Sequence, residues 1–363
     1  MTIFYFHFLS RVVVIGNILF FFSHRVNREK VLKMSIIKHL VLSGGGPSGI
    51  QTLGTLQHLE MNNVWKLENI QTIYATSSGA ILSVLIALQF DWETINNYII
   101  CRRWHETYKI TADMIFNSYI NKGLFTTSSV ELFYKPFFDS KDLSLQMTMK
   151  EFFEYTNIEL HFFSLEINSF EIVDVSFKTF PDLPIIHAVY MSCSIPIIFC
   201  PFYIEDKCFV DGMVISNYPL SYCIRLYDKN EILGIKNING GIDKDTVENK
   251  ITLSTTLLDY VTRFISKLIV LANSANKNED VLENECICNT TFIDFMYMKN
   301  ALCSESIRRC LLEKGIKDAI DFLESRDKNE KTTTITTTIT TTITTTTNQC
   351  QLDSAKSTDN SII

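Results

Sequence analysis

Three short stretches of this 363-residue chain carry residues whose types and spacing could do chemistry. The first is the glycine-rich run Gly44–Gly49, which opens with Gly44, Gly45 and Gly46 in succession. Consecutive glycines let the backbone approach a ligand closely and point several N–H groups into one concavity. At the start of a helix, where the dipole favours negative charge, such a loop could hold a phosphate or an oxyanion.

The second stretch, Ala75–Gly79, reads ATSSG and places a serine between a predicted strand and a predicted helix. In a nucleophile elbow, G-x-S-x-G, small residues on both sides of the serine let the chain turn sharply and expose the hydroxyl. Gly79 supplies the second glycine, whereas Ala75 replaces the first, so the turn is hindered but not excluded. Ser77 is therefore a candidate nucleophile, although a serine at a helix start is also typical of a plain N-cap.

The third stretch places Asp211 and Gly212 at the end of a short apolar strand. An Asp-Gly pair alone is a common turn. With a glycine loop and a serine elbow ahead of it in the chain, Asp211 becomes a candidate proton acceptor for Ser77. An aqueous aspartate, with a pKa of about 3.9, is a poor base at neutral pH. We therefore expect burial among its apolar sequence neighbours to raise the pKa of Asp211.

The histidines favour a Ser–Asp dyad over a Ser–His–Asp triad. All seven precede Asp211 in the chain, whereas the triad of α/β-hydrolases runs serine, acid, histidine. A triad built on another acid and His105, His161 or His187 would be cramped but stays open.

Two other functions of the glycine loop and one class of partner are disfavoured. A dinucleotide site needs a carboxylate at the end of the next strand, where this chain has Ala75–Ser77. A phosphate-binding P-loop needs a lysine and then a serine or threonine, but the chain has no such lysine and has Gln51 at the hydroxyl position. A net charge of −7 and a pI of about 5.6 provide no basic field for nucleic acid.

The elements that must position these residues alternate along the chain. Strands are predicted over Ile36–Ser43, Ile70–Ala75, Phe162–Ile167, Ile172–Ser176, Cys208–Asp211, Ile232–Lys236 and Thr290–Phe295. Helices are predicted over Ile50–Met61, Ser78–Gln89, Pro184–Ser192, Ser254–Ala275 and Ser304–Ser325. This alternation predicts an α/β fold, three-layered, with a mostly parallel central sheet flanked by helices. Open α/β sheets bind their ligands beyond the strand ends, where all three stretches fall.

These motifs, in this order, resemble those of the patatin-like phospholipase family. The resemblance covers about Ile36–Leu220 and continues more weakly to about Ser325. The family's G-G-G-x-[RK]-G loop, G-x-S-x-G elbow and D-G-[GA] turn correspond to Gly44–Gly49, Ala75–Gly79 and Asp211–Met213. Further similar stretches are Ser192–Pro196, Asn217–Pro219 and Gly315–Leu323.

The resemblance implies a phospholipase A-type acyl hydrolase that cleaves fatty-acyl esters of phospholipids or other lipids at a membrane surface. It implies that Ser77 attacks the ester carbonyl while Asp211 accepts its proton, giving an acyl-enzyme that water then hydrolyses. It also implies that Gly44, Gly45 and Gly46 hold the oxyanion, and that no metal or cofactor is needed.

Three positions depart from the family pattern. Ser48 stands where the family has Arg or Lys, Ala75 replaces a glycine, and Met213 replaces Gly or Ala. These departures bear on rate and substrate preference more than on reaction type. They also keep open an alternative, a catalytically impaired protein that binds lipid or a membrane without turning it over.

The N-terminal 34 residues contain an apolar segment, Phe4–Phe22, with one formal charge. About 20 apolar residues can cross a bilayer. Basic residues between Arg25 and Lys33 follow the segment, so the positive-inside rule would place the catalytic domain in the cytosol. Equally, residues 1–33 could be an extension that the working protein does not use, since Met34 precedes the first strand; the protein would then be cytoplasmic.

The C-terminal residues 328–363 are dominated by a threonine tract with almost nothing to bury. We expect this tail to be disordered. The acyl hydrolase domain is therefore predicted to span residues 35–327.

Overall fold

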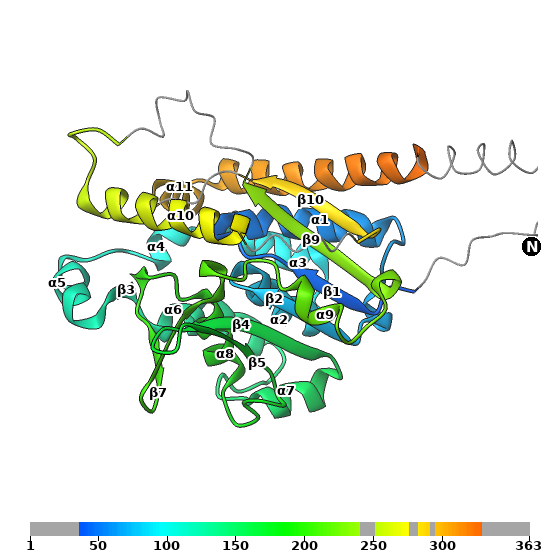
Figure 1. Ribbon diagram of the computed structural model, residues 1–363, viewed down its shortest axis with the longest axis horizontal. Helices are drawn as coiled ribbons and strands as arrows, with labels where there is room; N and C mark the ends of the chain where they lie inside the picture. The colour runs from blue at the N-terminus through cyan, green and yellow to red at the C-terminus, as the bar shows by residue number, and fades with distance from the viewer. Residues whose placement is uncertain (1–35, 240–250, 276–281, 291–294, 329–363) are drawn as a thin grey trace, which may run out of the picture. The chain divides into compact units, whose positions relative to one another are not determined.

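The structure, a computed structural model, describes residues 36–239, 251–275, 282–290 and 295–328 (Figure 1). The apolar N-terminal segment and the threonine tract lie outside the described residues. None of the described helices is both long and apolar enough to cross a membrane.

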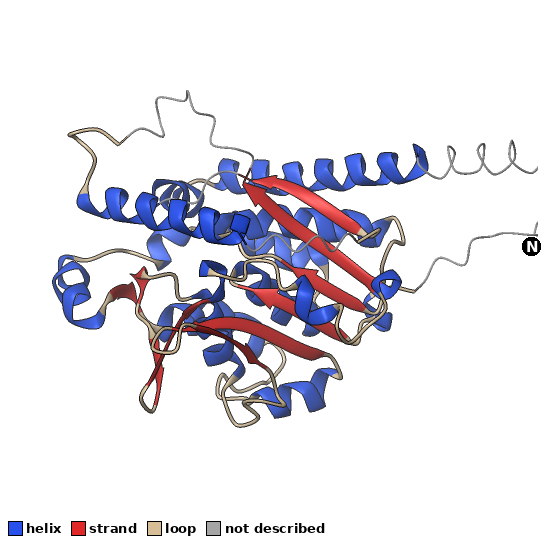
Figure 2. Cartoon of the chain, in the orientation of Figure 1, coloured by secondary structure: helices blue, strands red, loops and turns tan. Residues whose placement is uncertain are grey.

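The centre of the fold is a sheet whose strands run in the order β10-β9-β1-β2-β4-β8-β7, with β5 paired to β4 (Figure 2). Its strands are β1 (His39–Leu42), β2 (Thr72–Thr76), β4 (Glu159–Glu166), β5 (Glu171–Val175), β7 (Phe202–Ile204), β8 (Lys207–Asp211), β9 (Ile232–Asn239) and β10 (Glu285–Thr290). The five strands from β10 to β4 are parallel to their neighbours. In contrast, β5 and β8 run antiparallel to β4, and β7 runs antiparallel to β8. A further pair, β3 (Gly123–Phe125) and β6 (Ile197–Phe199), forms a small separate sheet.

The helices alternate with these strands along the chain. The labelled helices are α1 (Gly49–Met61), α2 (Ser78–Ala87), α3 (Trp92–Asn96), α4 (Trp104–Thr107), α5 (Ala112–Asn121), α6 (Thr127–Asp139), α7 (Met149–Thr156), α8 (Ile185–Cys193), α9 (Leu220–Cys223), α10 (Leu257–Ala275) and α11 (Phe295–Cys303). A last helix covers residues 305–328.

Side-chain alternation along the strands divides the core between the two faces of the sheet. On one face, Leu40 and Leu42 of β1 and Ile73 of β2 belong to the main apolar cluster, which also contains residues of α1, α2, α6 and α8. On the other face, Val41 and Tyr74 pack against α9 and the aromatic residues around it. Successive strand residues point to opposite faces of the sheet, so each face packs against its own apolar cluster.

The predicted α/β class, with a mostly parallel sheet flanked by helices, is confirmed. The strand predicted over Thr290–Phe295 is wrong: β10 ends at Thr290, and Phe295 begins α11. The buried alternation that forms β10 comes from Cys286 and Cys288, which fill the core as small apolar side chains. Helices α3 to α7 correspond to no predicted element.

Candidate active site

The pairing pattern of β4 brings the candidate nucleophile and the candidate base together. Thr76, the last residue of β2, lies opposite Phe163, and Asp211, the last residue of β8, lies opposite the next residue, Ser164. Because β2 runs parallel and β8 antiparallel to β4, their carboxyl ends point toward each other. Ser77, which follows Thr76, therefore meets Asp211.

Ser77 occupies a strained turn between β2 and α2. Its φ of 55° and ψ of −123° lie in a region that non-glycine residues rarely adopt, and such backbones cost on the order of 1–3 kcal/mol. The Ser77 N–H donates to Ser192 Oγ at 3.0 Å, and its carbonyl accepts from Cys193 Sγ at 3.0 Å. Ser192 Oγ in turn donates to the carbonyl of Phe163 at 2.7 Å. These bonds fix the turn from both sides.

The Ser77 hydroxyl points at the Asp211 carboxylate. Ser77 Oγ donates to Asp211 Oδ2 at 2.6 Å, and the Met213 N–H donates to Asp211 Oδ1 at 2.9 Å. Burial raises the pKa of the fully buried Asp211 to about 7, against the lowering effect of these two hydrogen bonds. Among the described residues, no histidine hydrogen-bonds to either side chain. The pair has the geometry of a hydroxyl and its general base.

The glycine loop lies directly beside Ser77. A Cβ placed on Gly44 would come within 2.8 Å of the Ser77 Cβ, so only glycine fits there. The Gly44 N–H already donates to the Asn217 carbonyl at 3.0 Å. The N–H groups of Gly45 and Gly46 donate to no other described residue, and Gly46 takes a left-handed φ of 52°. Two of the three N–H groups predicted to hold an oxyanion therefore have no hydrogen-bond acceptor among the described residues.

The remaining motif residues shape the backbone around this pair. Ala75 lies within β2 with its side chain in the main core, so the sharp turn falls at Ser77 and not at Ala75. Gly49, Gly79 and Gly212 are positions of close packing, where an added Cβ would come within 2.8 Å of Ser78, 2.7 Å of Leu42 and 2.3 Å of Phe163, respectively.

The structure also shows what replaces the family residue at two departing positions. Ser48 is fully buried, and its Oγ lies 3.2 Å from the hydroxyl of Tyr297 in α11. At the other position, Met213 holds Asp211 through its backbone N–H, which any residue except proline could supply.

Some residues of the site were not among the predicted site residues. Ser192 and Cys193 hold the Ser77 turn, and the Ser194 carbonyl accepts the Asp211 N–H at 3.0 Å. These three belong to a stretch that resembles the family, so the signal existed. Asn237, whose Nδ2 donates to the Gly44 carbonyl at 3.1 Å, carried no sequence signal.

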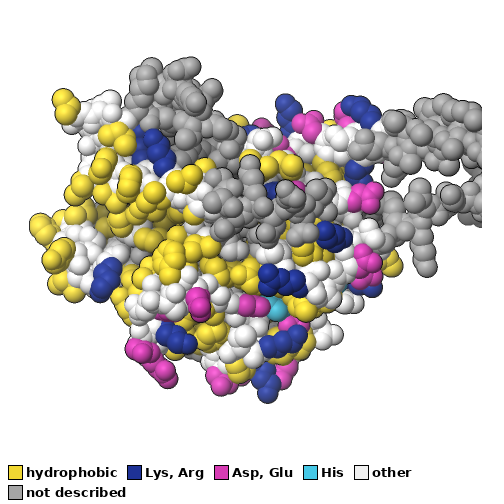
Figure 3. Space-filling view, in the orientation of Figure 1, with side chains coloured by type: hydrophobic (Ala, Val, Ile, Leu, Met, Phe, Trp, Pro, Cys, Tyr) yellow, Lys and Arg dark blue, Asp and Glu magenta, His cyan; other side chains and the backbone are white. Residues whose placement is uncertain are grey.

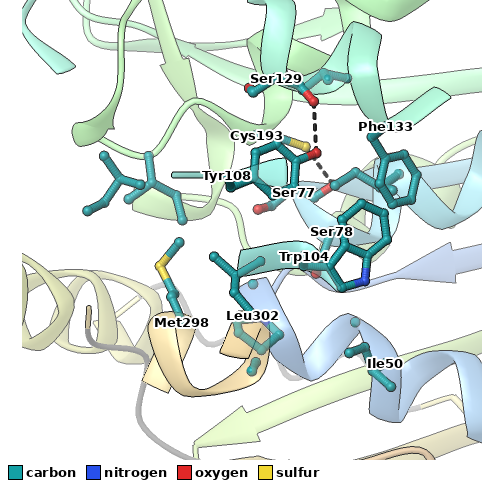
Figure 4. A pocket seen from close by; sticks show the side chains of 18 of the residues that line it. Ile50, Ser77, Ser78, Trp104, Tyr108, Ser129, Phe133, Cys193, Met298 and Leu302 are labelled. Carbon is teal, nitrogen blue, oxygen red and sulfur yellow. Dashed lines mark hydrogen bonds between the residues drawn. The ribbon is translucent and has the colours of Figure 1, made fainter. Parts of the chain in front are cut away.

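Ser77 borders a cavity of about 260 Å³ with an almost wholly apolar lining (Figure 4). The wall opposite the elbow comes from α4 with the following Tyr108, from α6 and from α11, and its residues include Trp104, Phe133, Met298 and Leu302. The Tyr108 hydroxyl donates to the Ser129 carbonyl at 2.9 Å, which ties this wall together. Such a cavity suits a hydrocarbon chain held next to the Ser77 hydroxyl.

Arg308, in the last helix, anchors the same wall from behind. It is almost fully buried and donates to the carbonyls of Ile100, Arg102, Ala301 and Leu302 at 2.6 to 3.2 Å. The Arg308 guanidinium thereby links residues 100–102, just before α4, to residues 301–302 in α11. Both segments adjoin the cavity.

Comparisons with known proteins agree with the motifs. The chain is 28% identical over 200 residues, 54% of its length, to the "Probable lipid hydrolase 463L" of Invertebrate iridescent virus 6, and this match covers 67% of the relative. It is 24% identical over 234 residues to an uncharacterized protein of Acanthamoeba polyphaga mimivirus, covering 64% of this chain and 76% of that protein.

Among solved structures, VipD from Legionella pneumophila superposes with a TM-score of 0.49 at 17% sequence identity, over 80% of this chain and 67% of VipD.

The model of the family described as patatin-like phospholipase matches residues 40–224, just over half of the chain. The chain therefore belongs to the patatin-like phospholipase family.

Proposed function

We propose that this protein is a lipid acyl hydrolase of the phospholipase A type, with Ser77 as nucleophile and Asp211 as general base. The observation that carries the proposal is the 2.6 Å hydrogen bond from Ser77 Oγ to a buried carboxylate, next to an apolar cavity. Family membership gives the reaction class, and the cavity supports a fatty-acyl group as the part of the substrate that is bound.

In the first step, Ser77 Oγ attacks the ester carbonyl carbon and its proton passes to Asp211 Oδ2. The negative charge that develops on the carbonyl oxygen is held by the N–H groups of Gly45 and Gly46. Removing one such donor typically costs about 2.7–4 kcal/mol of transition-state stabilisation. Collapse of the tetrahedral intermediate transfers the proton from Asp211 to the leaving alcohol and leaves an acyl-enzyme.

In the second step, Asp211 takes a proton from water, and the resulting hydroxide attacks the acyl-enzyme. The proton returns to Ser77 Oγ as the fatty acid leaves. Asp211 can act in both steps because its pKa of about 7 lies near neutral pH, where a general base is most effective. Neither step needs a metal or a cofactor.

The substrate is proposed to be a phospholipid or a related lipid ester at a membrane surface, in the course of lipid degradation. The similarity to a viral protein named as a probable lipid hydrolase supports this choice. We place the catalytic domain at residues 35–327. It faces the cytosol at a membrane if the N-terminal segment anchors it, and it is cytoplasmic if residues 1–33 are not used.

A fluorophosphonate probe tests the proposal, because only an activated serine forms the covalent adduct. We expect the wild-type protein to be labelled at Ser77, and Ser77→Ala to lose both the label and at least about 10³-fold of its ester hydrolysis. Ser78→Ala, at the neighbouring hydroxyl, is the matched control and should keep the label. Labelling or hydrolysis that persists in Ser77→Ala would reject Ser77 as nucleophile, and a folded wild type without label would favour lipid binding without turnover.

A further inference from the structure

Helix α5 exposes an apolar face that no described residue covers. Phe116 is 78% exposed and Tyr119 is 92% exposed, and Ile115 and Ile120 are also exposed. The four positions fall at i, i+1, i+4 and i+5, so they share one side of the helix. No residue of α5 is buried. Large apolar patches of this kind mark interaction surfaces.

Helix α10 carries a second exposed apolar row. Its exposed members include Leu257, Tyr260, Phe264 and Leu268. On the inner side of the same helix, Ile265 and Ile269 pack in a small cluster with Met298 of α11. One apolar side of α10 therefore packs against the rest of the protein, and a second apolar side is exposed. Figure 3 shows the hydrophobic side chains gathered over α5 and α10 at the left of the molecule.

Neither helix contributes a lining residue to the cavity beside Ser77, but each lies next to residues that do. Met298, which packs against α10, is also part of the cavity lining. Met114 and Asn117 of α5 line a second hollow of about 360 Å³ that shares Tyr108 and Phe125 with the cavity. Each exposed apolar row therefore lies on a helix whose other residues contact or adjoin the lining of the proposed acyl site.

The charged residues on and beside α5 are Asp113 in its first turn and two flanking lysines, a net positive charge that favours an anionic surface. Lys109 precedes the helix and Lys122 follows it, and both are exposed. Neither lysine forms an ion pair with a described residue, although Lys122 Nζ lies 5.6 Å from the centre of the Tyr203 ring. An apolar helix face with aromatic residues and flanking lysines is typical of helices that lie in the headgroup region of a bilayer.

We propose that α5, together with the first half of α10, is the face by which this protein docks on a lipid bilayer that contains anionic headgroups. The proposal rests on the proposed function, because it explains how an acyl chain reaches a serine that is only 2% exposed. Phe116 and Tyr119 enter the headgroup region, Lys109 and Lys122 contact lipid phosphates, and the acyl chain passes from the bilayer to the neighbouring cavity at Ser77.

A site-specific fluorescence experiment on the full-length chain tests the docking face. Phe116→Trp places an indole on α5, and Met61→Trp places one at a 75% exposed position at the far end of α1. Helix α1 starts beside the site and is about 20 Å long, so Met61 lies far from the proposed face. Both are made with Ser77→Ala so that the vesicles stay intact.

The vesicles contain phosphatidylcholine and phosphatidylserine with brominated acyl chains, which quench an indole only at close range. We expect quenching of the α5 indole and none of the α1 indole, each measured as a difference from Ser77→Ala alone. This comparison holds even if another segment of the chain also binds the vesicles. Equal quenching of both indoles, or none at α5, would overturn the proposal.

A functional experiment separates docking from catalysis. The double variant Phe116→Ser, Tyr119→Ser should bind these vesicles and hydrolyse their lipids about tenfold less well or worse, because two aromatic side chains no longer enter the bilayer. Its hydrolysis of a soluble short-chain ester should equal that of wild type, and Met61→Ser should change none of these.

The outcomes distinguish the two proposals. Weakened vesicle binding in a protein that hydrolyses no ester at all would keep the docking face and reject the proposed function. Unchanged vesicle binding in the double variant would reject the docking face alone. A wild-type dimer that the double variant converts to a monomer in sedimentation equilibrium would instead identify the face as a contact between two copies.

Discussion

Two acidic side chains lie beside opposite ends of β4 and differ in their surroundings. Glu159 begins the strand, and Asp211 lies opposite Ser164 near its end. Burial raises the pKa of Glu159, but Lys178 Nζ at 2.6 Å and His161 Nε2 at 3.0 Å outweigh it, so the pKa is lowered overall. No cation of the described residues lowers the pKa of Asp211, which stays raised to about 7.

The difference shows that burial alone does not make a carboxylate a base. His161 also contacts Asp174 at 2.8 Å, so the end of β4 at Glu159 is a network of ion pairs in which each charge has a partner. A paired carboxylate holds its negative charge and has little tendency to take a proton. The carboxylate at the other end meets only hydrogen-bond donors, and one of them is the hydroxyl that it would deprotonate.

Exchanging each carboxylate for its amide should give the largest contrast. Asp211→Asn keeps the shape and an oxygen acceptor but cannot take the Ser77 proton, so we expect kcat/KM for a soluble ester to fall by about 10²–10⁴-fold. Glu159→Gln should leave kcat/KM within about twofold, because Glu159 makes its contacts away from the site. An equal loss in both variants would show that the effect is structural.

The pH dependence of the wild-type enzyme should report the unpaired carboxylate. Asp211 must be charged to accept a proton, and its pKa is about 7. We expect kcat/KM to rise about tenfold per pH unit up to about pH 7 and then to level off. A profile that stays flat down to pH 5 would mean that Asp211 titrates at an ordinary aspartate pKa.

Stability should respond to the same two substitutions with opposite signs. The raised pKa of Asp211 means that its contribution to the free energy of unfolding is lost as the pH rises from about 4 to about 7. Asp211→Asn removes the buried charge and should therefore stabilise the protein at pH 8, by about 1–3 kcal/mol.

Glu159 has a lowered pKa, so its contribution is present at neutral pH and is lost as the pH falls below the ordinary glutamate value. Glu159→Gln should destabilise the protein at pH 8 by about 1–3 kcal/mol, because His161 and Lys178 lose a partner. Urea unfolding of wild type and both variants at pH 8 and pH 5 measures these differences, which should shrink at pH 5 for Asp211→Asn. Destabilisation by Asp211→Asn at pH 8 would contradict the raised pKa.

The elements that carry the motifs could be predicted from the sequence, because their signals are local. The apolar runs that become β1 and β2 and the apolar pattern of α2 are visible without knowledge of the partners they pack against. Strand β10 was misplaced because its buried face consists of Cys286 and Cys288, which are weak strand signals. Helices α4 and α6, which contribute Trp104, Val130 and Phe133 to the cavity wall, lie in a region where the sequence predicts no element.

The sequence by itself determined the order of the glycine loop, the serine elbow and the strand-end aspartate, and through them the family. It also indicated that the aspartate would need burial to act as a base. Tertiary structure alone decided that Ser77 meets Asp211, because β8 reverses direction against β4 and brings two strand ends together across 134 positions of chain. It likewise decided that Asp211 is buried with no described cation beside it while Glu159 is buried beside Lys178 and His161, since a pKa depends on neighbours in space that no local pattern specifies.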